Sequence, residues 1–127
     1  MIESDGALAF MDQRPAAPGH VLVIPKAPVT SILDATDEQL ADVMALARCV
    51  AIAQSRAFKA DGLTGIALRQ NNGAPNQHVG HFHLHLVPQY ATPATIGRSG
   101  DDPRRAAACG RPHPGVSAAT GCPSVKT

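Results

Sequence analysis

The sequence predicts an α+β domain in which an antiparallel sheet of about five strands packs on one long helix. Two patterns predict it. Apolar residues recur at helical spacing through residues 37–57, and short apolar or alternating segments typical of strands lie on both sides of that helix. With 127 residues, 44% of them hydrophobic, the chain has room for one domain around one core.

Two apolar segments near the amino terminus predict paired strands. Residues 7–11 form a short apolar segment, and residues 20–24 form a continuous run rich in β-branched side chains, typical of a buried strand. Residues 12–19 between them contain two prolines and one glycine, which favour turns. We therefore expect a hairpin-like pair of strands with His20 at its mouth.

A helix is predicted from its first residues onward. Thr36 and Gln39 have the spacing of a capping box, in which each side chain satisfies a backbone amide at the helix start. Leu46 and Ala53 lie off the apolar stripe and indicate either a second apolar face for a partner subunit or a broad core face. The stripe that predicts the helix over residues 37–57 consists of Leu40, Val43, Met44, Ala47, Val50 and Ala51.

Two more strands are predicted after the helix, over residues 62–69 and 81–88, with a polar turn containing glycine and proline between them. In the second strand, His81, His83 and His85 alternate with apolar residues. Because successive side chains of a strand point to opposite faces, the three imidazoles share one face and the apolar residues pack into the core from the other.

This row of imidazoles is the strongest indication of function. Imidazole titrates near neutral pH, so three of them offer a nucleophile, a proton donor and an anion-stabilising group without a metal. Neighbouring residues on that face lie about 6.5–7 Å apart, so one phosphoryl-sized group can contact more than one ring. The alternative is that the row binds zinc. Residues 71–90 contain no carboxylate or cysteine, and we expect neither a metal nor a cofactor.

Charge and composition limit the partners. A net charge of +1 and an aromatic content of 3% provide neither a cationic surface nor stacking platforms for nucleic acid, and no membrane surface is indicated. Any nucleotide ligand is therefore expected to be a small molecule. The sequence has no basic-then-apolar leader and no run of about eighteen apolar residues, so the cytoplasm is the expected location.

The composition changes after Tyr90. Residues 91–127 are rich in alanine, glycine, proline, arginine and serine, without a periodic apolar pattern. We predict a folded domain over residues 1–90 and a disordered tail over residues 91–127.

Two separated motifs resemble one family. Residues 77–88, QHVGHFHLHLVP, resemble the signature of the histidine triad (HIT) family, Q-x-V-x-H-x-H-x-H followed by apolar residues. Residues 9–12 and 15–26 resemble the first block of the same family in order and distance. The resemblance covers about residues 7–90.

The resemblance implies a nucleotidyl hydrolase or transferase that acts at the α-phosphorus of a purine nucleotide conjugate: a dinucleoside polyphosphate, a nucleoside phosphoramidate or an adenylyl conjugate. His83, the middle histidine, would attack the phosphorus and form a nucleotidyl-histidine intermediate without a metal. His81 would orient the triad, His85 would bond the phosphate oxygens and His20 would support the triad from the neighbouring strand. The resemblance also implies a homodimer.

Substrate-binding roles follow from the same match. The carboxylate of Asp12 would bind the ribose hydroxyls, and Gln77 would meet the phosphate or the bridge to the leaving group. Phe10 and Leu22 would wall the base pocket.

Several positions depart from the family pattern. Asn71 and Asn72 each offer the amide expected near the phosphate, and we name Asn72 as the candidate although the spacing does not decide between them. His78 stands where serine or threonine is common and is either a fourth participant near the leaving group or an exposed loop residue. Gly80 replaces a bulky residue and is expected either to leave space beside the phosphate or to loosen the strand. The chain also begins close to its first strand, which predicts a thin wall on one side of the pocket.

Three classes of function stay open at this point. The first is the enzyme just described. The second is a nucleotide- or partner-binding module that keeps the fold but turns over slowly, and the third is a zinc-binding protein that uses the histidine row.

Overall fold

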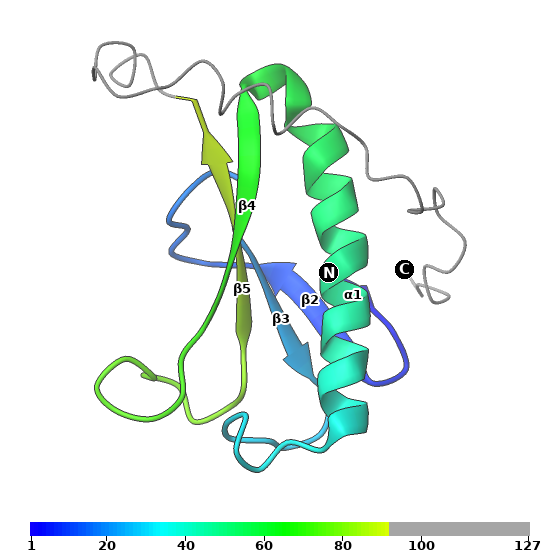
Figure 1. Ribbon diagram of the computed structural model, residues 1–127, viewed down its shortest axis with the longest axis vertical. Coiled ribbons are helices and arrows are strands. Elements are labelled where there is room, and N and C mark those ends of the chain that lie inside the picture. The colour runs from blue at the N-terminus through cyan, green and yellow to red at the C-terminus, as the bar shows by residue number, and fades with distance from the viewer. Residues whose placement is uncertain (92–127) are drawn as a thin grey trace, which may run out of the picture.

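The computed structural model describes residues 1–91, which form one layer of antiparallel sheet covered on one face by a single long helix (Figure 1). The sheet has five strands, which agrees with the predicted number, and their order is β1-β2-β3-β5-β4. The predicted disordered tail lies outside the described residues, apart from Ala91. The elements are β1 (Ile2–Glu3), β2 (Ala7–Met11), β3 (Val21–Pro25), α1 (Asp37–Ala57), the 3-10 helix η1 (Lys59–Asp61), β4 (Leu63–Gln70) and β5 (Leu84–Tyr90).

The helix begins and ends where the sequence predicts. The Thr36 backbone N–H donates to Gln39 Oε1 at 2.9 Å, and the Gln39 backbone N–H donates to Thr36 Oγ1 at 3.2 Å, which completes the capping box. Asp37 and Glu38 add negative charge to the first turn, where the helix dipole is positive. The series of backbone hydrogen bonds along α1 ends at Phe58, whose backbone N–H donates to the Gln54 carbonyl.

The core lies between α1 and one face of the sheet. Alternate residues of β2, β3 and β5 supply the sheet side of this core, and buried residues at helical spacing supply the other side. Leu46 is fully buried, so the core face of α1 is broad and Leu46 is not part of a second apolar face. Met44, which the predicted stripe includes, is 53% exposed instead, because the buried stripe is centred on Val43, Leu46, Ala47 and Val50.

The histidine strand is shorter at its start than predicted. β5 begins at Leu84, so His81 and His83 precede it, because β4 ends opposite Leu84 and β3 pairs with β5 no further than this residue. The Phe82 backbone N–H donates instead to the carbonyl of Val29 in a loop, at 2.7 Å. Phe82 is nevertheless buried while its histidine neighbours are half-buried, so the predicted division between the two faces holds.

β2 and β3 form the expected antiparallel pair, with Phe10 opposite Leu22.

Among the described residues, α1 is the longest helix, and no helix is long and apolar enough to cross a membrane.

The turn between β2 and β3 ends at Gly19, which has a φ of 83° and lies against the end of α1. A Cβ atom added at this position would lie 2.4 Å from Phe58 Cε2. Glycine is therefore required here twice, once for the left-handed backbone and once for the close approach of the Phe58 ring.

This requirement can be measured. Gly19→Ala is expected to lower the free energy of unfolding by about 2–4 kcal/mol, from left-handed strain together with overpacking. Gly62→Ala is a matched control, because Gly62 has a φ of 87° and no atom within 4 Å of an added Cβ; strain alone predicts a loss of about 1–2 kcal/mol. Equal losses in urea denaturation of the two variants would show that the contact with Phe58 is unimportant.

Candidate active site

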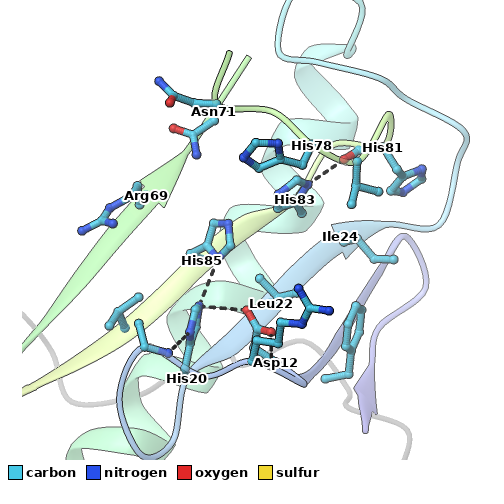
Figure 2. Close-up of a pocket in the computed structure, with 16 residues that line it drawn as sticks. Asp12, His20, Leu22, Ile24, Arg69, Asn71, His78, His81, His83 and His85 are labelled. Atoms are coloured by element: carbon cyan, nitrogen blue, oxygen red, sulfur yellow. Dashed lines mark hydrogen bonds and ion pairs between the residues drawn. The ribbon is translucent and has the colours of Figure 1, made fainter. Parts of the chain in front are cut away.

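A pocket of about 970 Å³ opens on the face of the sheet opposite to α1, because its lining residues alternate along the strands with the core residues that pack against the helix. Its floor follows from strand register. Phe10 of β2 lies opposite Leu22 of β3, Leu22 lies opposite His85 of β5, and His85 lies opposite Arg69 of β4. All four residues line the pocket (Figure 2). The row therefore changes from apolar to imidazole to cation across four strands.

Further side chains complete the lining. Ile24 and Val87 extend the apolar part of the floor, and Val79 comes from the loop before β5. The predicted catalytic residues all lie in this one pocket: His20, His81, His83 and His85. The sequence-based expectation that alternate imidazoles share one face thus describes their placement correctly.

The hydrogen bond of His83 determines which of its ring nitrogens faces the pocket as a base. His83 Nδ1 lies 2.8 Å from the backbone carbonyl oxygen of His81. A carbonyl only accepts, so Nδ1 carries the proton and donates. In the neutral ring the lone pair is therefore on Nε2, which leaves this atom able to act as a nucleophile or a base.

His81 supports the site in two ways. Its backbone carbonyl accepts the His83 proton, and its own ring Nε2 donates to the carbonyl of Pro25 at 3.0 Å. The second bond attaches the segment that precedes β5 to the end of β3, next to the point where strand pairing stops.

His20 is held in one protonation form by its loop. The Ala16 backbone N–H donates to His20 Nδ1 at 3.1 Å, so this nitrogen carries a lone pair and neutral His20 carries its proton on Nε2. His20 Nε2 lies 2.9 Å from His85 Nδ1 and therefore donates to it. His20 is 4% exposed, so the loop and the two strands enclose it.

This bond also determines the form of His85. Burial is the main cause that lowers the pKa of His85, and the neighbouring His83 and His20 lower it further. Neutral His85 accepts at Nδ1, so its proton is on Nε2, where it can donate to a ligand oxygen. Together, His83 and His85 present a lone pair and an N–H group whose rings lie 5.0 Å apart between centroids.

Asp12 lies at the end of β2 beside this pair. Its Oδ1 accepts the backbone N–H of Arg14 at 2.8 Å, and its Oδ2 lies 3.6 Å from His20 Nε2. The carboxylate lines the pocket and is partly exposed, so it retains lone pairs that a ligand hydroxyl can approach.

The zinc alternative was based on the row of His81, His83 and His85. Within the described residues, the ligand atoms that lie close enough together belong to another set, which includes only His85 of that row. Ligand atoms of Asp12, His20 and His85 all lie within 4.8 Å of one another, close enough to share an ion. Binding through His20 Nε2 would require a lone pair there and a proton on Nδ1. The Ala16 N–H already points at Nδ1, so a metal would have to displace that hydrogen bond. The donor set fits a metal poorly.

Two residues expected to bind substrate do not line the pocket. Gln77 Oε1 accepts the backbone N–H of Gly73 at 2.7 Å, and its Nε2 donates to the carbonyl of Thr30 at 2.6 Å, so the side chain joins two loops. Asn72 Oδ1 accepts the backbone N–H of Ile32 at 2.7 Å. Its neighbour Asn71 lines the pocket instead. The turn uses Asn72 to fix its own shape and directs Asn71 toward the ligand.

Of the two unusual positions before the triad, His78 lines the pocket and Gly80 does not. His78 is exposed and also lines the pocket, so the two sequence-based alternatives for it are compatible with each other. A Cβ added at Gly80 would meet no atom within 4 Å, which agrees with the expected open space at this position.

Arg69 is the main pocket residue that sequence reasoning missed. The predicted strand ended at this residue, and no role was assigned to it. Ile66 packs against the core, so strand alternation places Arg69 on the opposite, open face, beside His85. The alternation of residues along this strand could be read from the sequence. The pairing of Arg69 with His85 could not, because it depends on the register between β4 and β5.

Comparison with known proteins identifies relatives of this chain. The family model described as the HIT domain matches residues 1–92. An HIT-like protein of Mycoplasma genitalium is 38% identical over 96 residues, which cover 75% of this chain and 66% of that protein. Adenosine 5′-monophosphoramidase of Saccharomyces cerevisiae is 38% identical over 89 residues, which cover 70% of this chain and 52% of that protein.

A solved structure gives the same result. The crystal structure of a HIT-like protein from Bartonella henselae matches with a TM-score of 0.64 and 42% sequence identity, covering 69% of this chain and 63% of that one. A sheet with this histidine row and these relatives defines one class of protein, and the chain belongs to the HIT family. It spans about half to two thirds of the length of the relatives named here.

The lowered pKa of His85 predicts how stability depends on pH. Unfolded His85 titrates near 6.5 and the folded form titrates lower, so the unfolded state binds more protons between these two values. The contribution of His85 is complete above pH 6.5 and is lost as pH falls toward the folded pKa. We expect the urea midpoint of the wild type to fall more between pH 7.5 and 5.5 than that of His85→Gln. Identical changes in the two proteins would contradict the lowered pKa.

Proposed function

We propose that this protein is a nucleotide hydrolase of the HIT type, which cleaves the bond between the α-phosphorus of a purine nucleotide and its leaving group. The observation that carries the proposal is the pair of defined ring nitrogens in one pocket, a lone pair on His83 Nε2 and an N–H on His85 Nε2. The yeast relative, named adenosine 5′-monophosphoramidase, supports a phosphoramidate as the first substrate to test.

In the first step, His83 Nε2 attacks the α-phosphorus and forms an N–P bond. The P–N bond to the leaving amine breaks, its electron pair goes to the amine nitrogen, and that nitrogen takes a proton from solvent water. The His85 N–H donates to a phosphate oxygen and stabilises the charge that develops there. The proton of His83 stays on Nδ1 and is donated to the backbone carbonyl oxygen of His81, which stabilises the positive ring of the nucleotidyl-histidine intermediate.

In the second step, a water molecule attacks the same phosphorus and loses a proton to the solvent, which returns the proton taken in the first step. The N–P bond breaks, its electron pair returns to His83 Nε2, and the nucleoside monophosphate leaves. Two displacements at one phosphorus replace one difficult displacement by water. Transfer to another acceptor would follow the same course, with that acceptor in the place of water.

The rest of the pocket fits the parts of a nucleotide. Phe10 and Leu22 offer an apolar surface to the base, and the Asp12 carboxylate accepts hydrogen bonds from the ribose hydroxyls. Arg69 lies on the other side of His85 and contributes positive charge near the phosphates.

We further propose that the protein forms a homodimer. β4 is the last strand in the sheet order, so its outer edge is unpaired within the described residues. Leu68 on this strand is 49% exposed. Both the unpaired backbone groups of this edge and the exposed Leu68 side chain would be covered if a second copy packed against it. Sedimentation equilibrium measures the mass, and a monomeric mass at micromolar concentration would contradict the dimer.

His83→Ala is expected to lower the turnover of adenosine 5′-monophosphoramidate by at least about a thousandfold, because the nucleophile is lost. Binding of adenosine monophosphate, measured by calorimetry, is expected to change little. The wild type quenched during turnover is expected to carry an adenylyl group on His83, detected by mass spectrometry.

Three outcomes would contradict this assignment. Comparable activity of His83→Ala would exclude His83 as the nucleophile. Saturable binding without turnover by the wild type would support the nucleotide-binding module, and one zinc per chain in the purified protein would support the metal-binding alternative.

Asp12→Ala is expected to act on binding instead of on chemistry. Loss of charge-assisted hydrogen bonds to the ribose predicts that KM rises about 10- to 100-fold while kcat changes little. A 2′,3′-dideoxyadenosine substrate serves as a control, since it lacks the hydroxyls and its KM should respond weakly to the substitution. An unchanged KM for the ribose substrate would contradict the role of Asp12.

A further inference from the structure

A polar residue interrupts the apolar face of α1. Val43, Leu46, Ala47 and Val50 form the buried stripe of the helix, and Gln54 continues the same stripe with 4% exposure. A buried amide costs free energy unless it forms hydrogen bonds, and an apolar residue would continue this face at lower cost. The presence of glutamine at this position therefore requires another explanation.

The Gln54 side chain bonds two strands at once. Its Nε2 donates to the backbone carbonyl of Gly19 at 2.7 Å and to that of Leu86 at 3.3 Å. Its Oε1 is buried and forms no hydrogen bond. Because both partners are acceptors, only the NH₂ group can face them, and the orientation of the amide is fixed even though its oxygen stays unsatisfied.

The two bonded carbonyls are next to the two histidines that touch each other. Gly19 immediately precedes His20, and Leu86 immediately follows His85. One amide on the core side of the sheet thus joins the same two chain segments that the 2.9 Å bond between His20 Nε2 and His85 Nδ1 joins on the pocket side.

We propose that Gln54 is a positioning residue that sets the separation of His20 and His85, and through it the protonation form in which His85 faces the ligand. The end of the helix supports this function, since the Phe58 ring packs against Gly19 one turn further along. Gln54 and Phe58 together fix the backbone from which the His20 side chain extends. The kinetic consequences rest on the proposed hydrolase function, whereas the hydrogen bond between the two rings does not.

The first test reads the histidine rings directly. In ¹⁵N-labelled wild-type protein at pH 7.5, we expect His20 with its proton on Nε2 and a scalar coupling across the bond from His20 Nε2 to His85 Nδ1. Gln54→Leu removes the Nε2 group that donates to Gly19 and Leu86 and puts an apolar side chain in place of the amide. It is expected to abolish the coupling and to leave His85, whose Nδ1 then no longer accepts from His20, as a mixture of its two neutral forms, with the proton on Nδ1 or on Nε2.

The second test is kinetic and uses adenosine 5′-monophosphoramidate. For Gln54→Leu, kcat is expected to fall on the order of tenfold, less than the hundredfold that a misplacement of about 1 Å can cause, while KM stays within about twofold. Gln39→Leu is the matched control. It breaks the capping box at the far end of the same helix, so it lowers stability without touching either histidine.

A second variant keeps the test informative if Gln54→Leu does not fold. Gln54→Glu keeps the shape, but its ionised form offers no donor, whereas its protonated form offers one to Gly19. The ratio of its kcat to that of the wild type is therefore expected to rise as pH falls and the introduced carboxyl becomes protonated. The coupling between the two rings should return over the same pH range.

The outcomes separate the two proposals. If Gln54→Leu lowers stability as Gln39→Leu does but keeps the ring coupling and kcat, Gln54 is only a packing residue and the inference is overturned. A kcat ratio of Gln54→Glu that stays constant while its carboxyl titrates would also overturn it. If the wild type has no activity but Gln54→Leu still loses the ring coupling, the proposed function fails and the positioning role stands.

Discussion

The hydrogen bond between His20 and His85 joins β3 and β5 on the open face of the sheet, and the arrangement of the pocket depends on it. It has a direction because the Ala16 N–H occupies the other nitrogen of His20. The direction then passes to His85, whose remaining N–H faces the pocket. A backbone amide in a loop thus determines where a proton lies two rings away. Neutral imidazole transmits this information because each ring has one donor and one acceptor.

A single helix leaves one face of the sheet free, and this division of the two faces determines where chemistry takes place. Core residues and pocket residues alternate along the same strands, so the packing against α1 fixes the positions of groups on the other side. Gln54 and Phe58 extend this relation, because both contact Gly19 from the helix while His20 points into the pocket. The stability of the core and the geometry of the site are therefore properties of the same backbone.

Local patterns in the sequence predicted much of this structure. The capping box and the apolar period gave α1 its correct ends, and the alternation of histidines gave the correct face for His81, His83 and His85. Contacts between distant segments were not predictable in this way. The start of β5 depends on where its pairing with β3 and β4 stops. Which of Asn71 and Asn72 lines the pocket depends on a hydrogen bond to a loop about forty residues away in sequence. Gln54 has no local signature, since its partners lie on strands whose register the sequence does not state.

The row formed by Phe10, Leu22, His85 and Arg69 runs across the strands and not along one of them. Neighbouring residues of this row are separated by the interstrand spacing of about 4.8 Å, so the row spans roughly 14 Å across the four strands. Backbone hydrogen bonds between the strands keep these distances constant whatever side chains the four positions have. A substitution at one of the four positions would change which chemical group is recognised there, while the backbone distances to the other three positions would be preserved.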